Sequence, residues 1–452
     1  MPSSDTGIDA AHRRVIFASS LGTVFEWYDF YLYGTLAVFF SALFFPPGND
    51  TAAFLASLAT FGAGFAVRPL GALVFGRVGD LVGRKYTFLI TIIVMGASTA
   101  LVGVLPTYAQ IGIWSPVLLV TLRLAQGLAL GGEYGGAATY VAEHAPPGRR
   151  GAYTSWIQTT ATLGFFLSLA VILACRLGFG EDAFHAWAWR VPFLLSVILL
   201  GVSVYIRLKL EESPVFLDIK AAGGLSRAPL TESFGHWPNA RIVLLALFGA
   251  TAGQGVVWYT GQFYALFFLQ NTLKLDFQVS YLLVAAALLA GTPFFVIFGT
   301  LSDRIGRRRI MITGCLLAAL TFIPIFKGLT HSVNPALAEF EQRAAITVAG
   351  DDCHVHIFTK PKTACDQVRD FLTKAGVSHE RLPQDGDNEV VTMIGATRLV
   401  GFDETRYREA LAASGYPATA DPERVNLPVT LLLLWILMIY VTMVYGPIAA
   451  YL

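Results

Sequence analysis

The sequence predicts an all-α polytopic membrane protein, built from two related helical bundles with a small α+β segment inserted in the second. Hydrophobic residues form 55% of the 452-residue chain and charged residues only 14%, a balance that soluble domains of this length do not show. Apolar runs of about 20 residues, long enough to cross a bilayer, follow one another along most of the chain. A short charged, glycine-rich stretch also occurs twice at matching places, which indicates an internal duplication.

About ten apolar runs reach spanning length. They cover residues 15–45, 52–75, 86–105, 113–142, 153–175, 191–208, 242–269, 279–301, 310–326 and 427–452. We therefore expect a tail (1–14), a six-span bundle (15–208), a polar linker (209–241), spans seven to nine (242–329), an α+β insert (330–426) and a tenth span (427–452). Two six-span halves would need about twelve spans, so we expect the last two to be absent, in a fragment or in a truncated gene product.

Cations are concentrated on one side of the predicted spans. Arg77, Arg84 and Arg149 fall in alternate connections, whereas the opposite connections hold chiefly Arg176 and Lys274. The positive-inside rule then places the N-terminus in the cytoplasm and the insert outside. We expect a multi-pass protein of a bacterial-type inner (plasma) membrane, with the lipid bilayer as its surroundings.

The repeated stretches cover residues 76–85 and 299–308. Glycine allows a tight connection between helices, the cations hold that face on the cytoplasmic side, and an aspartate can cap or pair with a neighbouring helix. We expect both stretches to act as gating loops. Their candidate residues are Gly76, Asp80, Gly83 and Arg84 in the first, and Asp303, Arg304, Gly306 and Arg307 in the second.

Acidic residues occur inside the first span, where they are costly. Glu26 and Asp29 lie three residues apart and share a helix face. An ionisable residue at bilayer depth costs about 2.5–3.5 kcal/mol on insertion scales, which favours a polar path or proton relay. The alternative is static pairing with intramembrane arginines. Arg68, in the second span, is the expected counter-charge.

The fourth span carries Arg123 and Glu133, whose ten-residue spacing keeps them close to one helix face. A carboxyl group beside a cation suits proton coupling, and a static ion pair is an equally good interpretation. Arg190 lies at the outer mouth of span six, where an interfacial anchor and a substrate contact both remain open.

Span seven presents a polar and aromatic face that includes Gln254, Tyr259 and Gln262. Such a face can line a cavity for a small solute, or its aromatic members can belong to the belt at the membrane boundary. We favour the cavity, with these residues in the substrate path.

Several of these motifs together resemble a known family. The repeated loops resemble the signature loop of the major facilitator superfamily. The runs at 26–30, 68–71, 131–136 and 189–193 are similar to those of its metabolite:proton symporter family, whose members move proline and betaine, 2-oxoglutarate, citrate or shikimate. This resemblance implies two rocking bundles and proton symport of a small organic acid or zwitterion. It implies a coupling role for Arg123 and suggests that Glu26, Asp29 and Arg68 line the path. The family generally has a short loop where residues 330–426 lie, so the insert departs from its pattern.

Within the insert, residues 346–358 and 389–399 read as strands, and 364–375 and 404–414 as helices. A disulfide between Cys353 and Cys365 is favoured because the space outside the membrane is oxidising, and free thiols are the main alternative. No Cys-x-x-Cys spacing supports a metal site.

Other functional classes lack support in the sequence. No phosphate-binding Gly-Lys-Thr loop is present, which argues against ATP-driven transport, and no nucleophile set indicates an enzyme. We therefore expect a small-molecule substrate and protons as partners, with no cofactor and no nucleic acid, and the oligomeric state is left open. The rival function is a truncated, non-transporting membrane sensor that binds a ligand or partner through the insert.

Overall fold

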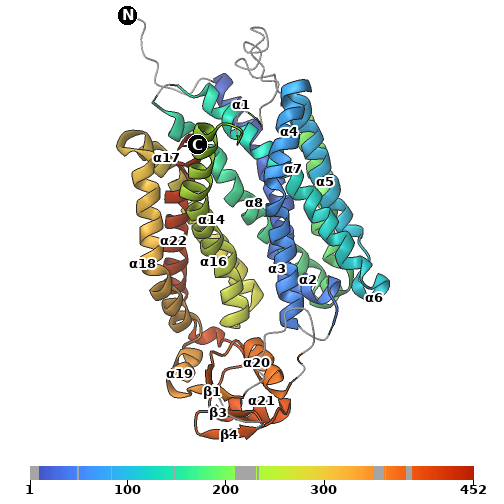
Figure 1. Ribbon diagram of the computed structural model, residues 1–452, viewed down its shortest axis with the longest axis vertical. Coiled ribbons are helices and arrows are strands. Elements are labelled where there is room, and N and C mark those ends of the chain that lie inside the picture. The colour runs from blue at the N-terminus through green and yellow to red at the C-terminus, as the bar shows by residue number, and fades with distance from the viewer. Residues whose placement is uncertain are drawn as a thin grey trace, which may run out of the picture.

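The computed structural model describes residues 10–47, 50–82, 84–146, 148–208, 231, 234–350, 361, 363–382 and 389–451. Two groups of long helices lie side by side, and a small α+β unit lies at the end of the molecule away from the N-terminus (Figure 1). Within the described ranges, nine helical segments are long and apolar enough to cross a membrane.

The first group of helices spans most of the N-terminal half. Its elements are α1 (Ala10–Thr35), α2 (Ala37–Phe44), α3 (Asp50–Ala66), α4 (Arg68–Val82), α5 (Arg84–Val104), α6 (Tyr108–Ile111), α7 (Trp114–His144), α8 (Arg150–Phe179), α9 (Glu181–Ala183), the π-helical segment η1 (Phe184–Ala188) and α10 (Arg190–Leu208). Helix α1 packs against α8 and α10, so the acidic residues of the first span face other helices. The second predicted span is interrupted before Arg68, because Pro69 lacks the N–H that would continue the helical hydrogen bonds.

The second group follows the linker, most of which lies outside the described residues. Its elements are α13 (Trp237–Leu244), η2 (Leu245–Thr251), α14 (Ala252–Tyr259), η3 (Thr260–Tyr264), α15 (Ala265–Phe267), η4 (Phe268–Thr272), α16 (Phe277–Gly291), α17 (Pro293–Ile305), α18 (Arg307–Val333), α22 (Leu427–Tyr445) and α23 (Ile448–Tyr451). Span seven alternates between α- and π-helical segments from 237 to 272, and π-segments occur frequently at functional sites. Helix α22 packs against both α16 and α18.

The α+β unit contains a four-stranded sheet in the order β2-β1-β3-β4. Its elements are α19 (Pro335–Arg343), β1 (Ile346–Ala349), α20 (Ala364–Ala375), β2 (Glu380–Leu382), β3 (Val391–Ile394), β4 (Thr397–Val400), α21 (Glu404–Ala413) and the 3-10 turn η5 (Pro422–Arg424). Strand β2 pairs in parallel with β1, whereas β1 with β3 and β3 with β4 are antiparallel.

The predicted elements of this unit are partly corrected. Helix α20 has the predicted bounds and is capped by Gly376 at φ 72°, and α21 ends one residue early. The single strand predicted at 389–399 is wrong: the chain reverses at Gly395, whose φ of 57° suits a hairpin turn, and forms β3 and β4. The prediction also missed β2, which has three residues and no buried face.

Two asparagines hold the unit against the membrane helices. Asn334, at the start of α19, donates from Nδ2 to the carbonyl of Leu273 at 3.1 Å and accepts from the amide of Leu337. At the other end of the unit, the backbone N–H of Asn426 donates to the backbone carbonyl of Ser332 at 2.7 Å. Both connections of the insert are therefore fixed to the bundle.

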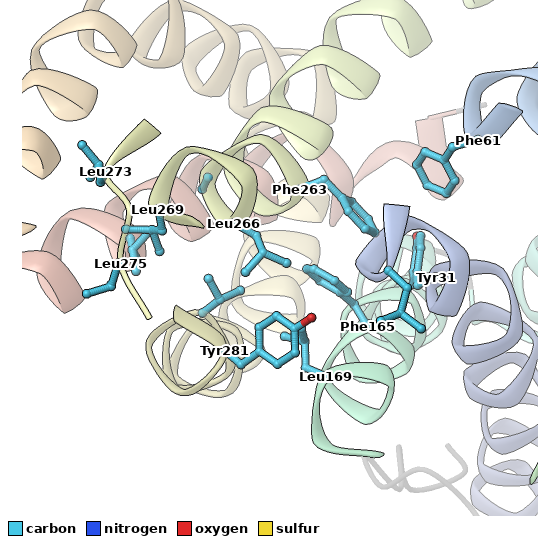
Figure 2. Close-up of a cluster of buried hydrophobic side chains, with 14 of the residues drawn as sticks. Tyr31, Phe61, Phe165, Leu169, Phe263, Leu266, Leu269, Leu273, Leu275 and Tyr281 are labelled. Carbon is cyan, nitrogen blue, oxygen red and sulfur yellow. The ribbon is translucent and has the colours of Figure 1, made fainter. Parts of the chain in front are cut away.

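The centre of the bundle is filled by aromatic side chains from both halves. Phe165 of α8 stacks on Phe263 of η3 with ring centroids 4.4 Å apart, and Tyr31 of α1 stacks on Trp258 of α14 at 5.3 Å. Figure 2 shows Tyr31, Phe61, Phe165 and Phe263 converging between the helices. This aromatic cluster joins the two halves in the middle of the molecule.

Candidate functional site

Arg123 on α7 is a fully buried guanidinium beside the aromatic cluster. Its Nη1 donates to Gln126 Oε1 at 2.6 Å and to the carbonyl of Phe30 at 3.3 Å. The guanidinium carbon lies 4.4 Å from the Phe30 ring centroid and 4.6 Å from that of Tyr33. Its Nε and Nη2 are buried without hydrogen-bond partners in the structure, and no described acid pairs with it. An uncompensated buried charge is costly, so an anion beside this guanidinium would stabilise it.

Arg68, at the start of α4, lies against the same ring. Its guanidinium carbon is 4.5 Å from the centroid of Phe30 and 4.0 Å from that of Phe65. The two predicted arginines of the path are therefore brought together around Phe30. Cation–π contacts of this kind hold a guanidinium in place without neutralising its charge.

Span seven brings the predicted polar residues of the second half to this place. Tyr259 interacts electrostatically with both Arg68 and Arg123, and its ring packs 5.1 Å from that of Phe65. Gln262 is fully buried, and neither its Oε1 nor its Nε2 has a hydrogen-bond partner in the structure. Gln254 is also buried, on α14. A buried side-chain amide without hydrogen bonds is costly, and a bound polar ligand could supply hydrogen bonds to Gln262.

Asp29 is buried on α1 and accepts a short hydrogen bond from the hydroxyl of Ser196 on α10. Among the described residues no cation forms an ion pair with it. A buried carboxylate without a cation is strongly disfavoured, whereas its protonated form is compatible with a hydroxyl partner. Asp29 is therefore a buried carboxyl group whose described hydrogen-bond partner is a hydroxyl group.

Glu26 forms a buried ion pair with Arg207, with Nη2 3.3 Å from Oε1 and exposed fractions of only 3% and 4%. This partner is not evident from the sequence, because Arg207 lies in the last turn of α10, where arginines usually extend toward the membrane surface. The first-span acids thus have different environments: Glu26 is paired with a cation and Asp29 is not.

Arg190 stabilises the packing of two helices. Its Nη1 donates to the carbonyls of Gly103 and Leu105, at 3.0 and 2.8 Å, where α5 ends. Cations favourably satisfy the free carbonyls of a helix C-terminus. Of the two interpretations left open by the sequence, the structure favours the anchor.

Glu133 lies on α7, but its side chain is outside the part of the chain that the structure describes. Its pairing with Arg123 stays a prediction.

The second repeated stretch joins the two halves at the end of the molecule that holds the N-terminus (Figure 1). Asp303 accepts hydrogen bonds from the amides of Gly151 and Ala152, both at 2.9 Å, at the start of α8. A carboxylate is favoured there by the partial positive charge of a helix N-terminus. Arg307 lies 3.4 Å from the same carboxylate and donates to the carbonyl of Ala450.

The second stretch is mostly helical, whereas its sequence predicts a loop. Helix α17 continues through Asp303 and the exposed Arg304 to Ile305, and the turn is confined to Gly306, whose φ of 97° favours glycine. In the first stretch α4 likewise runs to Val82, with Gly76 exposed. Gly83 and the side chains of Asp80 and Arg84 lie outside the described residues.

The cysteines of the insert are partly described. Cys365 is disulfide-bonded, and Cys353 lies outside the described residues, so their pairing stays a prediction. Within the described ranges, no group of three or more potential ligands could hold a metal ion.

Known proteins are similar to this chain in sequence and in fold. A family model of sugar (and other) transporters matches residues 15–232. The inner membrane metabolite transport protein YhjE of Escherichia coli is 37% identical, over 72% of this chain and 75% of that protein. The Escherichia coli shikimate transporter is 38% identical over 70% and 72%, and its alpha-ketoglutarate permease 36% over 75% and 76%. This chain belongs to the major facilitator superfamily.

Solved structures agree with this fold. A double-tryptophan variant of the xylose transporter XylE aligns with a TM-score of 0.55 at 18% identity, over 71% of this chain and 74% of that one. The proton:xylose symporter XylE bound to a halogenated glucose aligns with a TM-score of 0.52 at 14% identity, over 97% and 84%. The curated relatives are metabolite transporters, and together with the nine apolar helices of the described ranges they identify this major facilitator as a multi-pass inner-membrane transporter of metabolites and not an enzyme.

Proposed function

We propose that this major facilitator is a proton-coupled symporter of a small organic acid or zwitterion that works by alternating access. The observation that carries the proposal is Arg123, a buried guanidinium with two unpartnered nitrogens and no described acid beside it. A substrate carboxylate would supply the missing charge and the missing hydrogen bonds.

The two halves would hold opposite ends of such a substrate. Arg123 and Arg68 come from the first half, whereas the hydroxyl of Tyr259 and the amide of Gln262 come from the second. Midplane sites between the halves of a transporter are arranged in this way. Shikimate and alpha-ketoglutarate, named for two relatives, are both carboxylates, which supports this substrate class.

Proton coupling would use Asp29. Its carboxyl group is buried against Ser196 and has no described cation, so it holds a proton until water or the substrate changes its surroundings. Glu26 is less suited to this role, because Arg207 already stabilises its charged form.

Alternating access requires contacts between the halves that can open. At one end, Asp303 of α17 binds the N-terminus of α8. Toward the other end, Arg176 of α8 lies 3.4 Å above the ring centroid of Phe277 on α16. We assign the Asp303 end to the cytoplasm, because Arg304 and Arg307 to Arg309 are concentrated there, and the α+β unit to the opposite side.

The central test is uptake by proteoliposomes under an imposed proton gradient, with radiolabelled shikimate and 2-oxoglutarate as probes. Arg123→Lys keeps a positive charge but loses the planar fork of donors, so we expect at least about a tenfold loss of uptake. Arg241→Lys, at an exposed position on α13, is the matched control and should transport normally. Uptake that is the same with and without the proton gradient would contradict proton coupling. Full uptake by Arg123→Lys would contradict a substrate carboxylate bound at Arg123.

A further inference from the structure

A pocket of about 720 Å³ lies between the α+β unit and the turn that follows span seven. It is lined by α20 and α21 together with Lys274, which follows span seven. We propose that this pocket binds a small organic anion that combines a carboxylate with an apolar or aromatic body.

The charges of the pocket favour an anion. Asp370 is paired with Lys374 at 3.0 Å on α20, and Glu404 with Arg408 at 2.6 Å on α21. Both acids are thus neutralised within their own helices. Lys274 is different: its Nζ donates to the carbonyl of Lys374 at 3.2 Å, and no acid in the described ranges forms an ion pair with it. Among the described lining residues, one positive charge is therefore left for a ligand.

Burial destabilises the charged form of the Lys274 ammonium group, so a nearby negative charge would stabilise it. Desolvation lowers the pKa of Lys274 below its usual value. A bound carboxylate would offset this effect by stabilising the charged form, so binding and protonation of Lys274 favour each other.

The backbone holds Lys274 in an unusual conformation. With φ at 55°, it is the one non-glycine residue of the described chain that has a positive φ. The Lys274 carbonyl accepts a hydrogen bond from the backbone N–H of Ala420, which connects this turn to the α+β unit. Strained residues persist where the surroundings hold them firmly, and they are concentrated at ligand sites.

The remaining walls suit an apolar body. Phe371 and Phe402 pack with ring centroids 6.0 Å apart, and Leu411 continues the apolar surface. The hydroxyl of Tyr416 donates to the carbonyl of Ala375, which fixes the C-terminal end of α20. The volume is within the range of about 300–1,000 Å³ that is typical of small-molecule sites.

The position of the pocket connects it to the transport path. Lys274 follows directly on the span that carries Tyr259 and Gln262, and the other lining residues belong to the α+β unit. A ligand would therefore join the unit to span seven. This inference does not rest on the proposed function, because a non-transporting protein could bind the same anion.

The test is binding of 4-fluorobenzoate to the full chain in nanodiscs, followed by fluorine NMR. Its neutral isostere 4-fluorobenzamide and empty nanodiscs serve as controls. Measurements are made in the Arg123→Gln background, so that the transport site cannot contribute. We expect saturable binding of the benzoate and at least tenfold weaker binding of the amide.

Two variants at Lys274 separate charge from folding. Lys274→Gly removes the ammonium and relaxes the backbone, and it should weaken benzoate binding about tenfold without loss of folded protein. Lys274→Arg should retain most of the binding. Arg343→Gln, an exposed cation of the same unit that lies outside the pocket, should leave binding unchanged. Equal binding to the parent and Lys274→Gly, or equal binding of benzoate and benzamide, would overturn the proposal.

Discussion

At the scale of single residues, some buried ionisable side chains have a partner of opposite charge and others do not. Glu26 and Arg207 neutralise each other, whereas Arg123 and Asp29 each lack a described partner of opposite charge. Only uncompensated groups change their energy strongly when a substrate or a proton arrives. This contrast yields opposite predictions for two carboxyl groups on the same helix.

Asp29→Asn should uncouple transport from the proton gradient. The amide keeps a hydrogen-bonding partner for Ser196 but cannot exchange a proton. We expect substrate exchange between loaded proteoliposomes to continue, while accumulation driven by the gradient falls at least about tenfold. Accumulation equal to that of the parent would show that another group carries the proton.

Glu26→Gln should instead destabilise the protein. The substitution leaves the guanidinium of Arg207 buried without its counter-charge, at a cost of about 3–5 kcal/mol. We expect a clearly lower unfolding temperature in detergent than for Asp29→Asn, measured side by side. If the two variants unfold at the same temperature, the ion pair is not the main contribution of Glu26.

At the scale of elements, α8 and α17 form one contact between the halves near the N-terminal end. A Cβ on Gly151 would lie 2.4 Å from the carbonyl oxygen of Gly299, and one on Gly299 equally close to Ser155 Cβ. The backbones approach this closely because neither residue has a side chain. The amides at the start of α8 are thereby brought within reach of Asp303.

Gly151→Ala should open this end of the protein. The added methyl group cannot fit against the Gly299 carbonyl, so the helices must separate and the Asp303 hydrogen bonds weaken. We expect spin labels placed across α8 and α17 to show a larger share of long distances by pulsed EPR. Gly201→Ala on α10, where a Cβ meets no neighbouring atom, is the control and should leave the distances unchanged.

At the scale of the whole molecule, the α+β unit is attached at both of its chain connections and touches the turn after span seven. Asn334 connects the start of α19 to the carbonyl of Leu273, next to the pocket residue Lys274. Movement of span seven during transport would therefore reach the unit.

Asn334→Ala should loosen this attachment without unfolding the bundle. It removes the cap of α19 and the hydrogen bond to Leu273, a loss of about 1–2 kcal/mol. We expect faster amide exchange in α19 and in residues 273–275, with unchanged exchange in α8. Uniform acceleration throughout the protein would mean that the residue supports global stability instead.

The sequence by itself determined the membrane class, the repeat and most of the spans. These features depend on hydrophobicity and local chemistry, because a segment in lipid must be apolar and must satisfy its own backbone. Helix α20 was also predictable from local chemistry, because the residues that begin and end it, Thr363 and Gly376, directly flank it in the sequence. Only the tertiary structure decided that Arg207 pairs with Glu26, that Asp303 binds α8, and that Lys274 lines a pocket. Each of these contacts joins residues that are far apart in the sequence, and their proximity results from the packing of helices and the insert.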